Sequence, residues 1–220
     1  MERILPARRA VGIPSYTVGE EIFNAVSHGC GALLSVVALT IMVVRAQGAR
    51  AITTCAIFGA VMVLLYTVSC VYHALSPALA GKKVLRVIDH CNVFLMVLAS
   101  YLPASLLGVR GRLGYLLLAV VGSCTVTGIT LTVIDLERYK VASVICHLIS
   151  GWSILFGISS LLHTMGARGV GYLILGGVMY SVGSVLYGIG AKKRYRHGVF
   201  HVFCMLGTFF HFWAIYQYLL

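Results

Sequence analysis

The sequence has little charge. Only 10% of its 220 residues are Asp, Glu, Lys or Arg, whereas a typical soluble domain has about 25%. Hydrophobic residues make up 60% of the chain, well above the usual proportion of about 45–50%. A soluble protein could not cover its surface with so few charged groups, so the surplus of apolar side chains must face lipid. The composition therefore predicts an integral membrane protein.

Acidic side chains are the scarcest charged group. Six Asp and Glu stand against 17 Lys and Arg, which gives a formal net charge of +11. Such an excess could suggest binding to nucleic acid, but the basic residues lie almost entirely between apolar stretches, as the positive-inside rule describes for membrane proteins. We therefore expect no nucleic-acid partner. The first residues are polar and basic without a separate short apolar run, so no cleavable signal peptide is predicted.

Paired cysteines are also missing. Seven cysteines are scattered singly, each inside or beside a hydrophobic stretch, and no C-x-x-C occurs: Cys30, Cys55, Cys70, Cys91, Cys124, Cys146 and Cys204. This spacing is typical neither of a disulfide framework nor of a zinc finger. We expect the cysteines to pack as small hydrophobic residues without disulfides.

Seven apolar runs fill most of the chain, each close to the ~20 residues that cross a bilayer as a helix. They lie at 22–44, 51–75, 84–108, 113–134, 141–163, 169–190 and 197–219. The short breaks between them are rich in Gly, Pro and charge, which is typical of loops. The sequence thus predicts an all-α, seven-helix transmembrane bundle at 22–220, preceded by a cytoplasmic tail at 1–21.

The basic residues also predict an orientation. Twelve of the 17 Lys and Arg lie in the N-terminal tail and the second, fourth and sixth loops, and five lie on the opposite side. The positive-inside rule then places the N-terminus in the cytoplasm and the C-terminus outside. We expect a multi-pass protein of the cell membrane, inner or plasma.

Five polar side chains stand at the ends of three of these predicted helices. Ser69 and His73 close the second apolar run, Asp89 opens the third, and His197 and His201 open the last. In the predicted topology all five come to one depth near the cytoplasmic side. Ser69 and His73 are four residues apart, as are His197 and His201, so each pair shares a helix face.

Three imidazoles from neighbouring helices suit a zinc ion and leave a fourth position open, which is typical of catalytic zinc. Iron, cobalt or manganese could take the same ligands. Zinc lowers the pKa of a bound water from about 15.7 to about 7. Asp89 could then accept a proton, and Ser69 could hydrogen-bond to Asp89, to the water or to a substrate oxygen. The alternative is that the histidines only pack and that Asp89 is the counter-ion of Arg86 or of a loop arginine.

A second polar group opens the first apolar run. Glu20, Asn24 and His28 repeat every four residues and so share one face of a helix. Glu20 and Glu21 either cap the start of this helix, where the helix dipole favours carboxylates, or bond to the metal ligands. For Asn24 and His28 we expect an inward-facing position.

Four stretches resemble the hemolysin III family, the bacterial branch of the progestin and adipoQ receptor family. They are GEEIFNAVSH (19–28), SCVYHAL (69–75), RVIDHCNVFLMVLASYLP (86–103) and HGVFHVFCMLGTFFHF (197–212). The resemblance implies a zinc ion bound by His73, His197 and His201. It also implies that Asp89 and Ser69 lie beside this ion. The wider superfamily includes alkaline ceramidases, which implies a hydrolase, whereas the long N-terminal domain of the adiponectin receptors has no counterpart in this sequence.

Three functions remain open at this point. The first is a zinc-dependent hydrolase of an amide or ester in a membrane lipid, which resembles a ceramidase. The second is a membrane receptor or sensor with structural zinc, and the third is a lytic, hemolysin-like protein. A membrane lipid is the expected substrate or ligand. The sequence leaves open the identity of that lipid, whether zinc is catalytic, and the oligomeric state.

Overall fold

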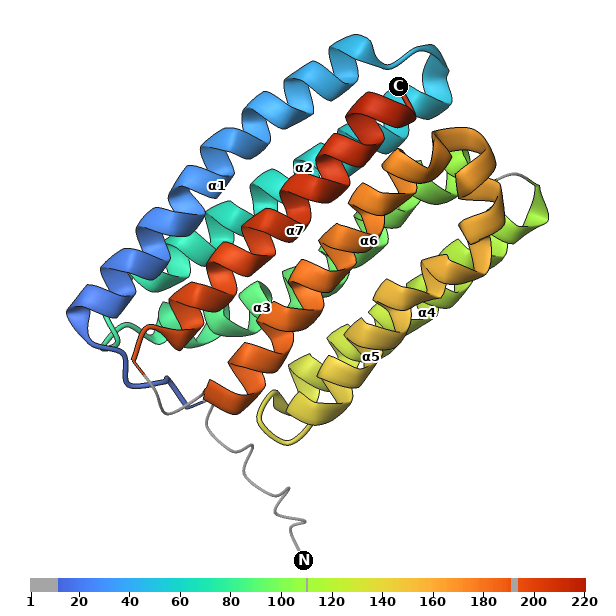
Figure 1. Ribbon diagram of the computed structural model, residues 1–220. Coiled ribbons are helices and arrows are strands. Elements are labelled where there is room, and N and C mark those ends of the chain that lie inside the picture. Colours follow the sequence, from blue (N-terminus) through green and yellow to red (C-terminus); the bar gives the residue numbers. More distant parts are fainter. Residues whose placement is uncertain (1–11, 110, 191–193) are drawn as a thin grey trace, which may run out of the picture.

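The computed structural model describes residues 12–109, 111–190 and 194–220, and these form a bundle of helices without any strand (Figure 1). The helices are α1 (Val18–Arg45), α2 (Gly48–Ala74), α3 (Ala80–Pro103), η1 (Ala104–Gly108), α4 (Arg112–Asp135), α5 (Lys140–Trp152), η2 (Ser153–Gly157), α6 (Ile158–Gly190) and α7 (Arg196–Tyr218). The all-α fold class is confirmed. Two short turns interrupt the α-helices: η1 is π-helical and η2 is a 3-10 turn.

Within the described ranges, six helical segments are long and apolar enough to cross a membrane. One of them, Lys140–Gly188, has 49 residues and would be about 73 Å long as a straight helix, more than twice the ~30 Å of a bilayer core. The helix is broken at Gly166, where φ is 68° and ψ is 175°, and the chain reverses direction there (Figure 1). Glycine adopts such a positive φ at little cost. The break falls in the predicted loop between 163 and 169, while the seventh span itself stays a prediction.

The first helix begins at Val18, four residues before the predicted run at 22–44, because the residue before it caps the helix. The Glu20 amide donates to Thr17 Oγ1 at 3.3 Å, and the Thr17 amide donates to the Glu20 carboxylate at 2.8 Å. This reciprocal pair is a capping box, which satisfies amides that would otherwise lack partners. Capping is therefore one role of Glu20.

Some sequence predictions concern residues outside the described ranges. They are the first eleven residues of the tail predicted at 1–21, and Arg110, Lys192 and Lys193, which entered the charge count. The side of the membrane on which each terminus lies stays a prediction.

Two apolar clusters hold the bundle together. One is centred on Phe58 and Met62 of α2 and takes in residues of α1, α3 and α7. The other includes Val121 of α4 and Leu161 of α6. α1 packs against α2 and α7, α6 packs against α7, and α3 lies between α2 and α4. This packing brings the end of α2 and the starts of α1, α3 and α7 to the same end of the bundle (Figure 1).

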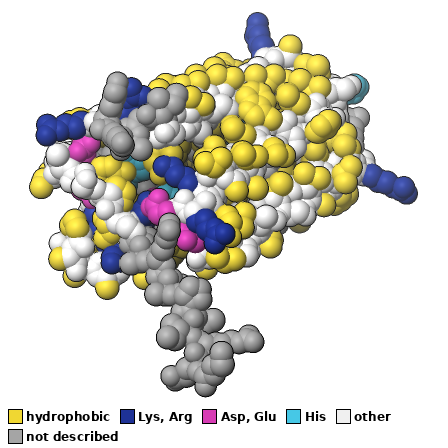
Figure 2. All heavy atoms as spheres, turned by 90° about the horizontal axis from the view of Figure 1, so that it is seen from below, with side chains coloured by type: hydrophobic (Ala, Val, Ile, Leu, Met, Phe, Trp, Pro, Cys, Tyr) yellow, Lys and Arg dark blue, Asp and Glu magenta, His cyan; other side chains and the backbone are white. Residues whose placement is uncertain are grey.

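The outer faces of the helices are apolar. Large hydrophobic side chains such as Leu33, Val44 and Phe156 are exposed. Figure 2 shows a broad hydrophobic band, with Lys, Arg, Asp and Glu gathered mainly at one end of the molecule. Exposed apolar surface of this extent is typical of contact with lipid. All seven cysteines are free, as expected.

Candidate metal centre

Three histidines meet at the polar end of the bundle. His73 lies in the last turn of α2, and His197 and His201 lie in the first two turns of α7. The Nε2 atom of His197 is 3.2 Å from Nε2 of His73 and 3.1 Å from Nε2 of His201. One ligand atom from each ring lies within 4.8 Å of the others. Imidazole nitrogens more than 120 positions apart in the sequence thus converge on one point.

The spacing of these nitrogens fits a metal ion. With a Zn–N distance of about 2.1 Å, tetrahedral geometry separates two ligand nitrogens by about 3.4 Å. The observed separations of 3.1 and 3.2 Å are close to this value. His73 and His201 are buried and His197 is half-buried. The site is therefore largely shielded from solvent, and an ion can enter on the side of His197. Three imidazoles suit zinc, and also iron or cobalt.

Glu21 of α1 holds the outer side of the His73 ring. Its Oε2 atom is 2.6 Å from His73 Nδ1, and its Oε1 atom accepts a hydrogen bond from Lys82 Nζ at 2.6 Å. Lys82 is fully buried and also donates to the carbonyl oxygen of Leu75 at 2.8 Å. A carboxylate on the second nitrogen of a ligand histidine fixes the ring orientation and raises its basicity. Glu21 and Lys82 thus aim Nε2 of His73 at the other two rings.

α1 also supports the two histidines of α7. Ser27 Oγ lies 3.3 Å from His201 Nδ1, and the His28 ring stacks on the His201 ring with centroids 3.5 Å apart. Tyr16, just before α1, stacks on His197 at 5.3 Å. Burial raises the pKa of the Tyr16 phenol above its usual range, so this side chain stays neutral. The three imidazoles are therefore enclosed by side chains from the start of the chain.

Asp89 of α3 and Ser69 of α2 line one cavity together with His197 and His201. The cavity measures about 180 Å³, and both Asp89 and Ser69 are buried. Ser69 Oγ lies near the Asp89 carboxylate but has no hydrogen bond of normal geometry to a described residue. Four of the five residues singled out in the sequence thus line one cavity, and the fifth, His73, lies beside it in the histidine cluster.

Asp89 is not the salt-bridge partner of Arg86. Arg86 Nη1 lies 2.7 Å from Oε1 of Glu137, in the turn between α4 and α5, and among the described residues Asp89 makes no salt bridge of its own. A buried carboxylate without a closely paired cation or hydrogen-bond donors is costly to keep ionised. Arg86 therefore makes no close salt bridge to Asp89, although its charge still acts on the Asp89 carboxylate, so the counter-ion alternative stays open.

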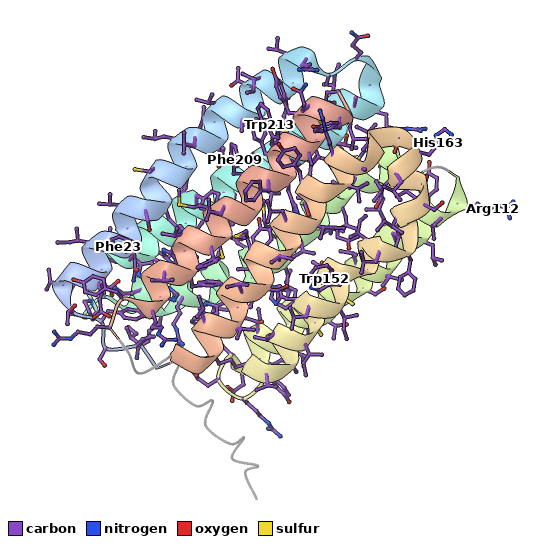
Figure 3. The ribbon with its side chains drawn as sticks, in the orientation of Figure 1. Phe23, Arg112, Trp152, His163, Phe209 and Trp213 are labelled. Carbon is purple, nitrogen blue, oxygen red and sulfur yellow. The ribbon has the colours of Figure 1, made fainter. Side chains whose placement is uncertain are left out.

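The remaining walls of the cavity are largely apolar. They come mainly from α3, α5, α6 and α7 and include Val93, Phe94 and Val97. Trp152, labelled in Figure 3, also lines the cavity, and its indole nitrogen donates to Ser181 Oγ at 3.0 Å between α5 and α6. The cavity therefore extends from the histidines into the hydrophobic interior.

The polar residues of α1 take distinct positions. Asn24 and His28 are buried, as expected for an inward-facing position. Glu20 both caps α1 and accepts a hydrogen bond from the Tyr195 amide at 2.8 Å, whereas Glu21 bonds to His73. Sequence reasoning missed the contacts of Ser27, Lys82 and Tyr16 altogether.

Replacing Glu21 by glutamine should weaken metal binding about 10- to 100-fold, because an amide cannot accept from the His73 ring and from Lys82 as a carboxylate does. The affinity can be measured by competition with a chelator of known zinc affinity. Asp135→Asn removes one negative charge without contact to a cluster histidine and should leave the affinity unchanged. Equal affinities of all three proteins would show that Glu21 does not support the site.

The fold and the site define a class of protein: an all-helical membrane protein with a histidine cluster and a buried carboxylate at one end of its bundle. Comparison with known families narrows this class. The family described as "Haemolysin-III related" matches residues 16–212. This chain belongs to the haemolysin-III related family.

Individual relatives agree with this assignment. "Hemolysin-3" from Bacillus cereus is 32% identical over 206 residues, which cover 92% of this chain and 93% of the relative. "Hemolysin-3 homolog" from Bacillus subtilis (strain 168) is 33% identical over 196 residues, with 88% and 91% covered. The human "Monocyte to macrophage differentiation factor" is 26% identical over 170 residues, with 74% and 69% covered. No solved structure matches this chain.

Proposed function

We propose that this protein is a zinc-dependent hydrolase that cleaves an amide or ester bond of a membrane lipid. One observation carries the proposal: three imidazoles converge on one point, and two of them, His197 and His201, line a cavity together with a buried carboxylate and a serine. Zinc held by three histidines would supply a Lewis acid that activates water for hydrolysis at neutral pH. His73, His197 and His201 are the residues that would hold it.

The other residues of the cavity have roles in moving protons. Asp89 accepts a proton from the attacking water and returns it to the leaving amine or alcohol when the acyl bond breaks. Ser69 donates a hydrogen bond to the Asp89 carboxylate or to the carbonyl oxygen of the substrate. The products are a fatty acid and the amine or alcohol that carried it.

A membrane lipid fits the shape and lining of the site. The apolar walls beyond the histidines suit an acyl chain, since ligand cavities are mostly apolar with a few convergent polar groups. Burial of Asp89 among such walls keeps bulk water away from the reaction. In the predicted orientation, with the N-terminus in the cytoplasm, the site lies near the inner leaflet.

A receptor or sensor with structural zinc is the second candidate. One observation favours it: through Glu21 and Ser27 of α1, the histidine cluster links three helices, α1, α2 and α7. In that case metal removal would loosen the bundle, and Asp89 would have no part in function. A lytic activity is the third candidate and rests on the printed name of the Bacillus cereus relative.

The hydrolase proposal is tested with purified, zinc-loaded protein and a panel of membrane lipids that includes ceramides, other N-acyl lipids and diacyl phospholipids. We expect fatty acid release, detected by mass spectrometry, from at least one class, and loss of this release after treatment with a chelator. Protein that binds zinc yet releases no fatty acid from any class would contradict the proposal.

A further inference from the structure

A second hollow lies at the same end of the bundle as the histidines. It measures about 270 Å³ and is formed by the segment before α1, the first half of α3, the turn between α4 and α5 with the start of α5, the end of α6 and the start of α7. Its charged lining consists of Arg86, Lys140, Arg196 and Glu137, and we call it the basic vestibule. Figure 2 shows Lys, Arg and His side chains together at this end of the molecule.

The basic vestibule carries a net positive charge, which favours the binding of an anion. Three cationic side chains face one carboxylate. Arg86, only 4% exposed, donates to the carbonyl oxygen of Gly12 and to Glu137, but its Nε atom is buried and has no partner among the described residues. A buried donor without an acceptor is unfavourable, so this guanidinium has capacity for a further anionic oxygen.

The other charged groups can turn toward a ligand. The Glu137 side chain is 51% exposed and is therefore free to leave Arg86. Lys140 and Arg196 are half-buried, and the Lys140 ammonium lies 4.4 Å from the centre of the Tyr187 ring. A phosphate group has the geometry to accept paired hydrogen bonds from a guanidinium and a further charge-assisted bond from a lysine. The vestibule matches that chemistry.

The basic vestibule and the apolar cavity adjoin each other. Lys140, Tyr187 and His197 line both of them. An anionic group in the vestibule would therefore sit at the polar end of a hydrophobic chamber. This arrangement is complementary to an amphiphile with a charged head and an apolar chain.

We propose that the basic vestibule binds the phosphate group of a membrane amphiphile whose apolar chain occupies the adjoining cavity. The inference rests on the proposed function in naming the substrate class of that hydrolase: phosphate-bearing lipids. Phosphate could reach the vestibule either as a lipid headgroup or as the free ion, and the experiment separates the two sources.

The test measures binding to the full chain in neutral detergent by isothermal titration calorimetry. The probes are dihexanoyl phosphatidylglycerol, dihexanoylglycerol, which has no phosphate, and inorganic phosphate. We expect Lys140→Gln/Arg196→Gln to weaken binding of the phosphatidylglycerol about 30-fold, because two charge-assisted contacts are lost. The matched control Arg112→Gln/Arg168→Gln removes the same charge from exposed positions away from the vestibule and should not alter binding (Arg112 in Figure 3).

A gain-of-affinity variant guards against misfolding as an explanation. Glu137→Gln removes the carboxylate that pairs with Arg86, and we expect it to tighten phosphatidylglycerol binding about fivefold. If inorganic phosphate binds as well and competes, the vestibule takes the free ion; if only the lipid binds, it takes the headgroup. Equal binding of both lipids, or no response to either vestibule variant, would overturn the proposal.

The same titration, combined with a hydrolysis assay, distinguishes failure of the phosphate-binding proposal from failure of the hydrolase proposal. His73 lines neither cavity, so His73→Ala should lose metal and hydrolysis while it keeps the affinity for phosphatidylglycerol. Intact phosphate binding without any hydrolysis in the wild type would contradict the proposed function alone. If the protein released fatty acid equally well from lipids with and without phosphate, only the phosphate-binding proposal for the vestibule would be contradicted.

Discussion

Replacing His197 and His201 together by alanine should reduce bound zinc from about one ion per chain to less than about a tenth of that, because a single imidazole cannot hold the ion against water. His73 would be the only remaining histidine of the cluster. The measurement is metal content by inductively coupled plasma mass spectrometry on detergent-purified protein.

The matched control for this experiment is His163→Ala. His163 is an exposed histidine at the opposite end of the bundle (Figure 3), so its replacement makes the same chemical change away from the cluster. It should keep the metal. If the folded wild type contained no metal, both the hydrolase proposal and the zinc-sensor alternative would be contradicted. The histidines would then serve as a hydrogen-bonded link between helices.

Asp89→Asn should lower the rate of lipid hydrolysis about 10²- to 10⁴-fold while the metal stays bound. Asparagine has nearly the shape of aspartate but cannot accept the proton of the attacking water, and general base catalysis contributes a factor of this size. The rate is measured as fatty acid released per chain at saturating lipid. Metal content is determined on the same preparation, so that a rate reduced by loss of the metal can be distinguished from a rate reduced by loss of the Asp89 carboxylate.

This variant also separates catalysis from structure. Asp135→Asn makes the same substitution at the end of α4, where the carboxylate accepts from the Arg138 amide at 3.0 Å, and should keep full activity. If Asp89→Asn were as active as the wild type with zinc bound, the metal would be structural. The second candidate function would then replace the first.

The helices could be predicted from the sequence because burial in lipid leaves a simple pattern. Apolar runs of bilayer length mark the six described segments that are long enough to cross a membrane, whereas the 3-10 turn at Ser153–Gly157 left no signal in the predicted run at 141–163. Gly166 falls in a predicted break because a positive φ favours glycine. The ends were harder to place. The capping box at Thr17 starts α1 before the apolar run does, since capping depends on hydrogen bonds rather than on hydrophobicity.

The histidine cluster was predictable for a different reason. Residues four apart on a helix share a face, so their spacing in the sequence is enough to pair His197 with His201. The support around the cluster was not predictable, because it depends on how helices rotate against one another. Glu21 and His73 are 52 positions apart, and Ser27 and His201 are 174 apart. Lys82, counted among the loop cations, is instead fully buried beneath Glu21.

The distribution of the cluster over the chain has a consequence for biogenesis. One imidazole belongs to the second helix and two belong to the last, with their supporting groups on the first. The ribosome must therefore complete almost the whole polypeptide before these groups can meet. An ion bound by the proposed site would then be loaded late in membrane insertion, and a nascent or C-terminally truncated chain would lack the ligands to acquire it. Occupancy by metal would mark the molecules that have finished assembly.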